Sequence, residues 1–455
     1  MRALSKTLVI SVLVAVIVVG GIAAYLLMSK SSSATKGEKV TTTTTQQPSL
    51  EACLKGPSAI IVYEKGEKDF ADTLLQYVEK QLASNLPPGT KFCALSAKET
   101  GLTSLPMYPA LVFKINMSEI KGKLRDFVLN ETLPGGYIPF RYDYFASFAT
   151  QLGMYLGKGA PRYTHEAKII IVNGNAPGTQ VNEKYLEVAK GRLAVALSAI
   201  FVADIKDIRV VNKPPANIVP DEYPAVYAES DADLAKYNPD LREVAPGIYY
   251  DYKDSLAELL AGLGLVPAAL IKYKPIPYLD KHPALGHGKI HIAIFDDIMC
   301  PFCAKLYISV MPKLIQYAKN NTITIHILDL PVHNSQVEFE FHKLMLCYYN
   351  KTHNAWSYYN ILYSTYKEIY SYILSGKAEQ KLATIIKKLE KEFNITPSCP
   401  AAKYVELSIQ HAQDVGIRGT PGIVIWRQGS KYMLISMGYH DIGWFIKAIK
   451  WMETH

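Results

Sequence analysis

The sequence lacks the motifs that bind nucleotides and catalytic zinc. It has no Gly-rich phosphate loop, no Rossmann fingerprint and no His-Glu-x-x-His pair among its 11 histidines. It also lacks a basic stripe, because the 49 Lys and Arg residues are scattered and accompanied by 41 acidic residues. The net charge of +8 therefore belongs to a solvated surface, and nucleotide-dependent enzymes, zinc proteases and nucleic-acid binders are disfavoured.

Cysteine is scarce, with six in 455 residues, yet two of the six stand close together. Cys300 and Cys303 follow an alternating apolar run that starts at Ile290 and predicts a buried strand. An amphipathic helical pattern over 304–320 comes next, and Pro301 suits the first helical position. The unpaired N–H groups at a helix N-terminus stabilise a thiolate. The pattern favours thiol exchange over its two alternatives, half of a zinc site and a structural disulfide ring.

A second motif lies downstream, where Gly419-Thr420-Pro421-Gly422 runs into the apolar strand pattern IVIW. Together the two motifs give residues 288–455 a clear resemblance to the DsbA-like thiol-disulfide oxidoreductases of the thioredoxin superfamily. In these folds a cis-proline packs against the Cys-x-x-Cys. The matching pieces are Phe295, Asp297, Cys300, Pro301 and Cys303, the stretch 328–336, the helical stretch with Cys347 and Trp356, and the run from Val415 to Pro421.

The resemblance implies a thioredoxin domain with a helical insertion over about 338–413. It implies that Cys300 is the exposed nucleophile and that Cys303, one turn on and more buried, resolves the mixed disulfide. A cis bond between Thr420 and Pro421 would leave the Thr420 backbone free to pair with an extended substrate.

The sequence departs from the family pattern at two positions. Phe302 stands where DsbA has a histidine, which argues mildly for a less oxidising potential. Ile294 stands where a buried acid is common, so Asp297 is the candidate proton relay in its place. His333 matches a histidine often seen in the family, but we assign it no catalytic role.

The N-terminus contains an uncharged apolar run, 7–28, long enough to cross roughly 30 Å of hydrocarbon. We expect a retained signal anchor, and the alternative is a cleaved signal peptide. The Ser/Thr-rich tract 31–50 predicts an extended stalk. The cysteines favour an oxidising compartment, so we expect the folded part on the extracytoplasmic side of the cell membrane. The candidate N-glycosylation sites are Asn116, Asn130, Asn320, Asn350 and Asn394.

The order of elements in the C-terminal region recurs twice upstream. Each recurrence reads as strand, helix and strand, followed by a Tyr-Pro pair before another strand, and neither carries cysteines in its first turn. We therefore predict an α/β protein with three thioredoxin-like modules in tandem, with Pro109 and Pro224 at the cis-proline positions. The predicted segments are a transmembrane signal anchor at 1–30, the stalk at 31–50, modules at 51–158 and 166–266, a linker at 267–288 and the DsbA-like domain at 289–455.

The remaining cysteines are expected to form structural disulfides. Cys53 and Cys93 both fall in the first module, and the alternative is two buried free thiols. Cys347 and Cys399 both fall in the helical insertion, and the alternative is that one of them takes part in relay chemistry.

The resemblance thus implies a membrane-anchored, extracytoplasmic thiol-disulfide oxidoreductase that forms, isomerises or reduces disulfides in exported proteins. It implies no organic cofactor and no metal, but net oxidation requires an electron acceptor, plausibly a quinone-linked membrane partner. By analogy with multi-module isomerases, the first two modules would hold clients near the active site. The alternative is a non-enzymatic surface or envelope protein, in which Cys300 and Cys303 form a permanent staple.

Overall fold

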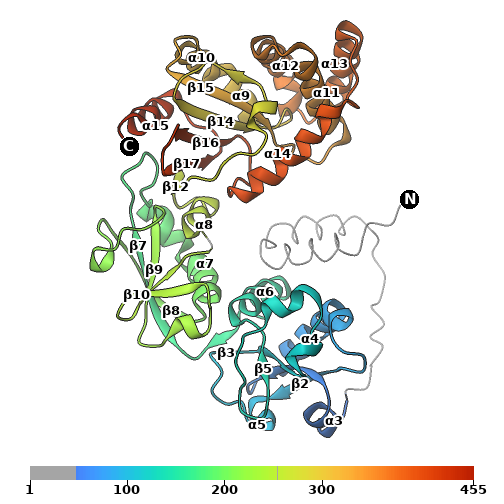
Figure 1. Cartoon of the computed structure of the whole chain (residues 1–455), viewed down its shortest axis with the longest axis vertical. Coiled ribbons are helices and arrows are strands. Elements are labelled where there is room, and N and C mark those ends of the chain that lie inside the picture. Colours follow the sequence, from blue (N-terminus) through green and yellow to red (C-terminus); the bar gives the residue numbers. More distant parts are fainter. Residues whose placement is uncertain (1–47, 254) are drawn as a thin grey trace. The chain divides into compact units, whose positions relative to one another are not determined.

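The structure is a computed structural model that describes residues 48–253 and 255–455 of a mixed α/β protein (Figure 1). The predicted membrane span 7–28 and most of the tract 31–50 lie outside the described residues. Within the described ranges, no helix combines the length and the apolar composition that crossing a membrane requires. The described residues divide into two compact units. One comprises 48–170, Ala189–Arg209 and Tyr227–Lys253, and the other comprises Ile171–Val188, Val210–Val226 and 255–455.

A four-stranded sheet in the order β2-β1-β4-β5 is built from the residues that follow the Ser/Thr-rich tract. Its elements are α3 (Leu50–Lys55), β1 (Ser58–Tyr63), α4 (Lys68–Leu82), β2 (Lys91–Ser96), α5 (Ala97–Thr100), β4 (Ala110–Lys114), β5 (Ile138–Pro139) and α6 (Tyr142–Leu156). β1 pairs in parallel with β2 and antiparallel with β4. As a central strand it is covered on both faces, which explains its unbroken apolar run at 59–62.

Two short strands, β3 (Met107–Tyr108) and β6 (Arg162–Tyr163), form a separate antiparallel pair. A five-stranded sheet follows in the order β10-β11-β9-β7-β8. Its strands and accompanying helix are β7 (Glu166–Val172), α7 (Glu183–Phe201), β8 (Asp204–Val211), β9 (Ala225–Glu229), β10 (Leu241–Ala245) and β11 (Ile248–Asp251). The next helix, α8 (Leu256–Gly262), contacts strand β12 (Ala268–Lys272) of the C-terminal sheet.

The C-terminal sheet has six strands in the order β12-β17-β16-β14-β15-β13. Its elements are β12 (Ala268–Lys272), β13 (Ala284–Leu285), β14 (Ile290–Asp296), α9 (Pro301–Ser309), α10 (Met311–Lys319), β15 (Ile323–Asp329), β16 (Gly422–Arg427), β17 (Tyr432–Met437) and α15 (Ile442–Thr454). Central β14 pairs in parallel with β15 and antiparallel with β16. The predicted helical insertion lies between β15 and β16 and consists of α11 (Gln336–Thr352), α12 (Ala355–Leu374), α13 (Ala378–Phe393) and α14 (Lys403–Asp414).

The stretch 267–288 is more than the linker that its proline content predicted. It contributes β12, which pairs with β17, and β13, which pairs with β15, to the C-terminal sheet. The reason is the short apolar run 268–271, which is buried against its neighbours in the sheet. The prolines around the run made it look like part of a linker, although proline is tolerated at the ends of edge strands.

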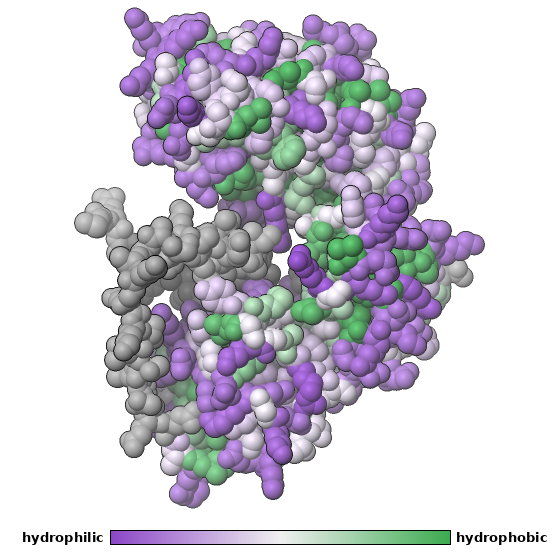
Figure 2. Space-filling view, turned by 180° about the vertical axis from the view of Figure 1, so that it is seen from behind, coloured by the Kyte–Doolittle hydropathy of each residue, from purple (hydrophilic) through white to green (hydrophobic). Residues whose placement is uncertain are grey.

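Among the residues that the structure describes, three X-Pro peptide bonds are cis, and they are the three that the sequence pattern marks out. They are Tyr108–Pro109, Tyr223–Pro224 and Thr420–Pro421. Each stands immediately before a strand, namely β4, β9 and β16. On the face of the molecule shown in Figure 2, hydrophilic residues are interspersed with small apolar patches, as a solvated surface requires.

Candidate active site

The thiol pair lies where β14 turns into α9. Asp297, Ile298 and Met299 form the turn, and the amide of Cys300 donates to the Asp297 carbonyl at 3.0 Å. Cys300 is the N-cap residue of α9, with extended backbone angles, and Pro301 occupies the first helical turn. The sequence therefore delivers the Cys300 sulfur to the positive end of a helix.

The two thiols have opposite acidities. Hydrogen bonding from Cys303, followed by contacts with Thr420 and the first amides of α9, lowers the pKa of Cys300 to about 6 against the cost of burial. Burial raises the pKa of Cys303 well above its ordinary value, and the thiol of Cys300 adds to this shift. A nucleophilic thiolate and a protonated partner therefore stand one helical turn apart.

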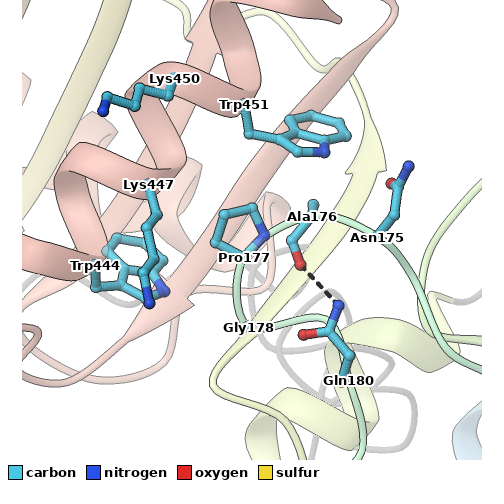
Figure 3. Close-up of a pocket in the computed structure, with 9 residues that line it drawn as sticks. All are labelled: Asn175, Ala176, Pro177, Gly178, Gln180, Trp444, Lys447, Lys450 and Trp451. Atoms are coloured by element: carbon cyan, nitrogen blue, oxygen red, sulfur yellow. Dashed lines mark hydrogen bonds between the residues drawn. The ribbon is translucent and has the colours of Figure 1, made fainter.

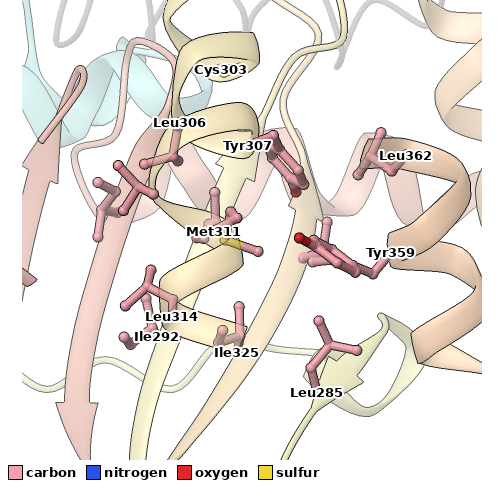
Figure 4. Packing of buried hydrophobic residues seen from close by; sticks show 14 of the residues in the cluster. Leu285, Ile292, Cys303, Leu306, Tyr307, Met311, Leu314, Ile325, Tyr359 and Leu362 are labelled. Carbon is pink, nitrogen blue, oxygen red and sulfur yellow. The ribbon is translucent and has the colours of Figure 1, made fainter. Parts of the chain in front are cut away.

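Cys303 faces the core between α9 and the helical insertion. Figure 4 shows it on α9 above Leu306 and Tyr307, with Tyr359 and Leu362 of α12 opposite them. All of these side chains belong to one buried cluster. The insertion thus closes the space around the second cysteine.

The sequence predicted an exposed Cys300, but the structure buries most of this residue. Only 5% of the surface of Cys300 is exposed, because the backbone of Thr420 covers its sulfur. The Sγ atom lies 3.3 Å from the Thr420 carbonyl oxygen, and the neighbouring Phe302 is 56% exposed. A partner chain must therefore approach along the Thr420 edge to reach the sulfur.

Asp296 is a functional candidate that the sequence reasoning missed. It is fully buried at the end of β14, and burial raises its pKa to about 7. Its charge is close enough to raise the pKa of Cys303. The missed clue is periodicity, since Asp296 continues the alternating face of Ile290, Ile292 and Ile294, which packs in the same cluster as Cys303.

The surroundings of Asp296 suit a carboxyl group that gains and loses a proton. The Tyr366 hydroxyl lies 2.8 Å from Asp296 Oδ2 and 3.0 Å from the Asp297 carbonyl oxygen. One hydroxyl proton cannot serve two acceptors, so both contacts are satisfied when Asp296 is protonated and donates to Tyr366. Asp296 Oδ1 has no hydrogen-bond partner within the described part of the chain. The carboxyl group of Asp296 is therefore placed to gain and lose its proton near neutral pH.

Asp297, the predicted relay, has a different role in the geometry. Its Oδ1 accepts from the Met299 amide at 2.7 Å, and its Oδ2 accepts from the Val332 amide and lies 2.6 Å from Nδ1 of His333. Burial opposes its charge, but the hydrogen bonds from His333 and Glu338 lower its pKa. Asp297 is thus an ionised anchor that ties the active-site turn to the loop after β15, and Asp296 is the better relay candidate.

Two groups of side chains have the composition of metal ligands, with ligand atoms within 4.8 Å of one another: Asp296, Asp329 and His342, and Asp297, His333 and Glu338. In the first group Nδ1 of His342 lies 2.8 Å from Asp329, and Nε2 accepts from the Ile298 amide. In the second group His333 Nδ1 is bound to Asp297. These hydrogen bonds already use the imidazole nitrogens that would face an ion, so we assign no metal to either group.

The other four cysteines are joined as expected from the sequence. Cys53 is bonded to Cys93 and Cys347 to Cys399, while Cys300 and Cys303 are free thiols. The second bridge links α11 to the segment before α14, so it closes the helical insertion on itself.

Removing the bridge within the insertion should destabilise the C-terminal domain. The two cysteines are 52 residues apart, and a loop of that length implies a loss of about 2–4 kcal/mol in the free energy of unfolding of the Cys347→Ser/Cys399→Ser variant. Urea denaturation of the oxidised protein measures the loss. An unchanged midpoint would show that the insertion does not depend on its bridge.

A pocket of about 540 Å³ lies away from the thiol pair, beside the turn between β7 and α7 (Figure 3). Trp444 and Trp451 of α15 line it together with the loop 175–180. Neither cysteine contributes to it.

Comparison with known families agrees with this geometry. Residues 284–432 match the family model described as Thioredoxin. The C-terminal region therefore contains a domain of the thioredoxin superfamily. This domain carries the thiol pair, the cis-proline and the helical insertion together.

Several solved structures are similar to this domain. α-DsbA1 from Wolbachia pipientis is 17% identical, with a TM-score of 0.32, and the match covers 40% of this chain and 93% of that one. Oxidised BdbD from Bacillus subtilis is 14% identical, with a TM-score of 0.30 and coverage of 40% and 99%. The catalytic domain of Proteus mirabilis ScsC is 16% identical, with a TM-score of 0.30 and coverage of 40% and 93%. A search of curated proteins found no match.

Proposed function

We propose that the DsbA-like domain exchanges thiols and disulfides with protein substrates. The observation that carries the proposal is the position of Cys300 Sγ at the N-terminus of α9, 3.3 Å from the carbonyl of Thr420, the residue before the cis-proline. A chain that pairs with the Thr420 backbone would bring its own sulfur beside this thiolate. The geometry therefore supports exchange through a mixed disulfide.

The proposed reaction transfers two electrons between the thiol pair and the substrate. The Cys300 thiolate attacks a substrate disulfide, so that a Cys300–substrate bond forms and the other substrate sulfur leaves and takes up a proton. Cys303 then loses its proton to Asp296 and attacks Cys300 Sγ, which releases the second substrate sulfur. The substrate is reduced and the pair becomes a disulfide, and the reverse sequence oxidises a substrate dithiol.

The direction in the cell depends on the reduction potential of the pair. Phe302 stands where DsbA has a histidine, which favours a potential less oxidising than that of DsbA. A redox titration of Cys300 and Cys303 distinguishes the roles, because about −120 mV indicates an oxidase and about −270 mV a reductase. For an oxidase, the electron acceptor would be a quinone-linked membrane partner.

The rest of the chain would place this domain outside the membrane. We propose that the apolar run 7–28 anchors the protein and that the active site works on exported proteins in the extracytoplasmic space. The asparagines of the candidate glycosylation motifs are all exposed, as that modification requires. We further propose that residues 51–158 and 166–266 are thioredoxin-like modules, which is supported by their sheets and by a cis-proline before β4 and β9.

The competing function is a surface protein with a permanent Cys300–Cys303 staple. Thiol reactivity separates the two ideas. Because the pKa of Cys300 is about 6, its alkylation by iodoacetamide should reach half its maximal rate near that pH, while Cys303 stays unmodified. The measurement is the rate of labelling of the reduced protein from about pH 4 to about pH 9, with the labelled residue mapped by mass spectrometry.

A staple would behave differently in the same experiment. It would resist mild reductant, and its thiols would react only when the domain unfolds. Equal labelling of both cysteines, or a midpoint above about pH 8, would also contradict the proposed site.

A further inference from the structure

The residue before each cis-proline lies close to the turn that follows the neighbouring strand in its sheet, which is β1 beside β4, β7 beside β9 and β14 beside β16. In the C-terminal sheet Thr420 contacts Cys300 in the turn between β14 and α9. In the five-stranded sheet a Cβ added to Gly174, in the turn after β7, would lie 2.7 Å from the Cβ of Tyr223. In the four-stranded sheet the equivalent residue is Tyr108, and the equivalent turn is 64–67 between β1 and α4.

In the first module this edge is occupied by the chain's own next segment. Tyr108 pairs with Arg162 in the antiparallel β3–β6 ladder, and the Thr164 amide donates to the Pro106 carbonyl at 2.9 Å. The Arg162 guanidinium lies over the Tyr108 ring and reaches Glu64 and Glu67 in the turn after β1. The segment therefore spans both the cis-proline edge and the turn that would hold a Cys-x-x-Cys.

In the second module the same edge is occupied in the same way. The amide of Tyr223 donates to the Leu270 carbonyl and the amide of Leu270 donates to the Tyr223 carbonyl, each at 2.7 Å. Two residues earlier, the Ala268 amide donates at 3.0 Å to the carbonyl of Gly178 in the turn after β7. The turn is also closed from within, because Gln180 reaches back to the Ala176 carbonyl (Figure 3).

In the third module the edge is unoccupied by the residues that the structure describes. No backbone hydrogen bond joins Thr420 to any of them, and its carbonyl is met only by the Cys300 thiol. This is also the module whose turn carries the reactive sulfur.

We propose that the two modules without a Cys-x-x-Cys use their cis-proline edges to hold the chain's own linkers as internal occupants. Residues 162–164 fill the first edge and residues 268–270 fill the second, so only the Thr420 edge is free to take up an extended client. The uptake of a client at the Thr420 edge rests on the proposed function, whereas the two internal contacts do not depend on it. The first two modules therefore do not hold clients at these edges.

Tethering explains why a client would not displace these linkers. A segment joined to its module by the chain has an effective concentration in the millimolar range. A free client at micromolar concentration would have to outcompete it for the same backbone groups. The Thr420 edge has no such competitor among the described residues.

Amide hydrogen exchange on a Cys300→Ser/Cys303→Ser variant tests the proposal without redox chemistry. The probe is a reduced, carboxymethylated unfolded protein added in excess. The amides of Thr164 and Tyr223 should be protected with and without the probe, and the Thr420 amide should gain protection only with it. Fast exchange at Thr164 and Tyr223 in the free protein, or probe-induced protection there, would overturn the internal occupancy. If the probe fails to protect the Thr420 amide alone, only the proposed uptake of a client at that edge is overturned.

Linker variants sharpen the test. Leu270→Pro removes the N–H that bonds Tyr223, while the alternating residues Ala269 and Ile271 keep the pairing of β12 with β17. Exchange at the Tyr223 amide should rise about tenfold and the probe should now protect it, whereas Leu270→Met, which keeps both the N–H and the side-chain volume, should change neither. In the first module Arg162→Glu should accelerate exchange at Thr164, and the exposed Arg125→Glu should not. Unchanged exchange in Leu270→Pro and Arg162→Glu would contradict the proposal.

Discussion

Replacing Cys300 with serine is expected to reduce disulfide exchange to the uncatalysed rate. The reaction needs a thiolate at the N-terminus of α9, and a serine hydroxyl does not ionise near neutral pH. The Cys303→Ser variant should fail differently, because Cys300 still attacks the substrate but nothing resolves the product. It should accumulate a covalent adduct with a disulfide-containing protein, visible on a non-reducing gel and joined through Cys300.

The Cys347→Ser/Cys399→Ser variant provides the matched control. It removes two cysteines from the same domain, yet it should retain exchange activity below its unfolding transition, because neither sulfur lies in the active-site turn. Full activity in both Cys300→Ser and Cys303→Ser would refute the catalytic assignment. An adduct through Cys347 or Cys399 would instead revive the relay alternative.

Replacing Asp296 with asparagine should change both stability and catalysis. An aspartate in an unfolded chain ionises near pH 3.9, while burial keeps Asp296 protonated to about pH 7. Between these values the folded state holds the additional proton, so stability falls as the pH rises, by as much as about 4 kcal/mol in total. The asparagine variant has no such proton and should lose this pH dependence.

The measurement is chemical denaturation of the reduced protein at several pH values between about 4 and 8. An unpaired amide group in place of Asp296 Oδ1 costs roughly 1–3 kcal/mol, so the slope against pH is more informative than the stability at one pH. The exposed Asp414→Asn is the control and should keep the slope. If Asp296→Asn also keeps it, the carboxyl group is ionised at neutral pH and is no relay.

The same variant should slow the resolving step. General acid–base groups contribute about 10²–10⁴-fold, and the Asp296→Asn variant lacks the proposed acceptor of the Cys303 proton. Stopped-flow kinetics should show normal formation of the mixed disulfide but slow release, with the inflection near pH 7 lost. Unchanged release would assign the proton to another acceptor.

Local patterns were sufficient to place the thiol pair. The alternation from Ile290 to Ile294, the turn and the helical pattern after Cys303 all lie within one stretch of chain, so strand, turn and helix follow from short-range periodicity. The helical insertion was predictable for the same reason, since its helices are amphipathic. The cis-prolines were located by their position before apolar strands.

Pairing between distant segments could not be predicted in this way. The sequence offered two adjacent aspartates. Only the fold shows that Asp296 is buried against Tyr366 of α12, close enough to raise the pKa of Cys303, while Asp297 anchors the turn. The run at 268–271 looked like part of a linker, because no local pattern reveals that it will meet β17 on one side and Tyr223 on the other.

The amino-acid sequence alone determines the position of the reactive Cys300 sulfur, since a cysteine at a strand-to-helix turn is specified by its immediate neighbours. Folding over long distances settles how that sulfur is used. It brings Thr420 to Cys300, buries Asp296 close enough to Cys303 to raise the pKa of that thiol, and fills the edges at Tyr108 and Tyr223 with the chain's own segments. These features depend on backbone pairing and burial between residues far apart in the chain, which no local periodicity encodes.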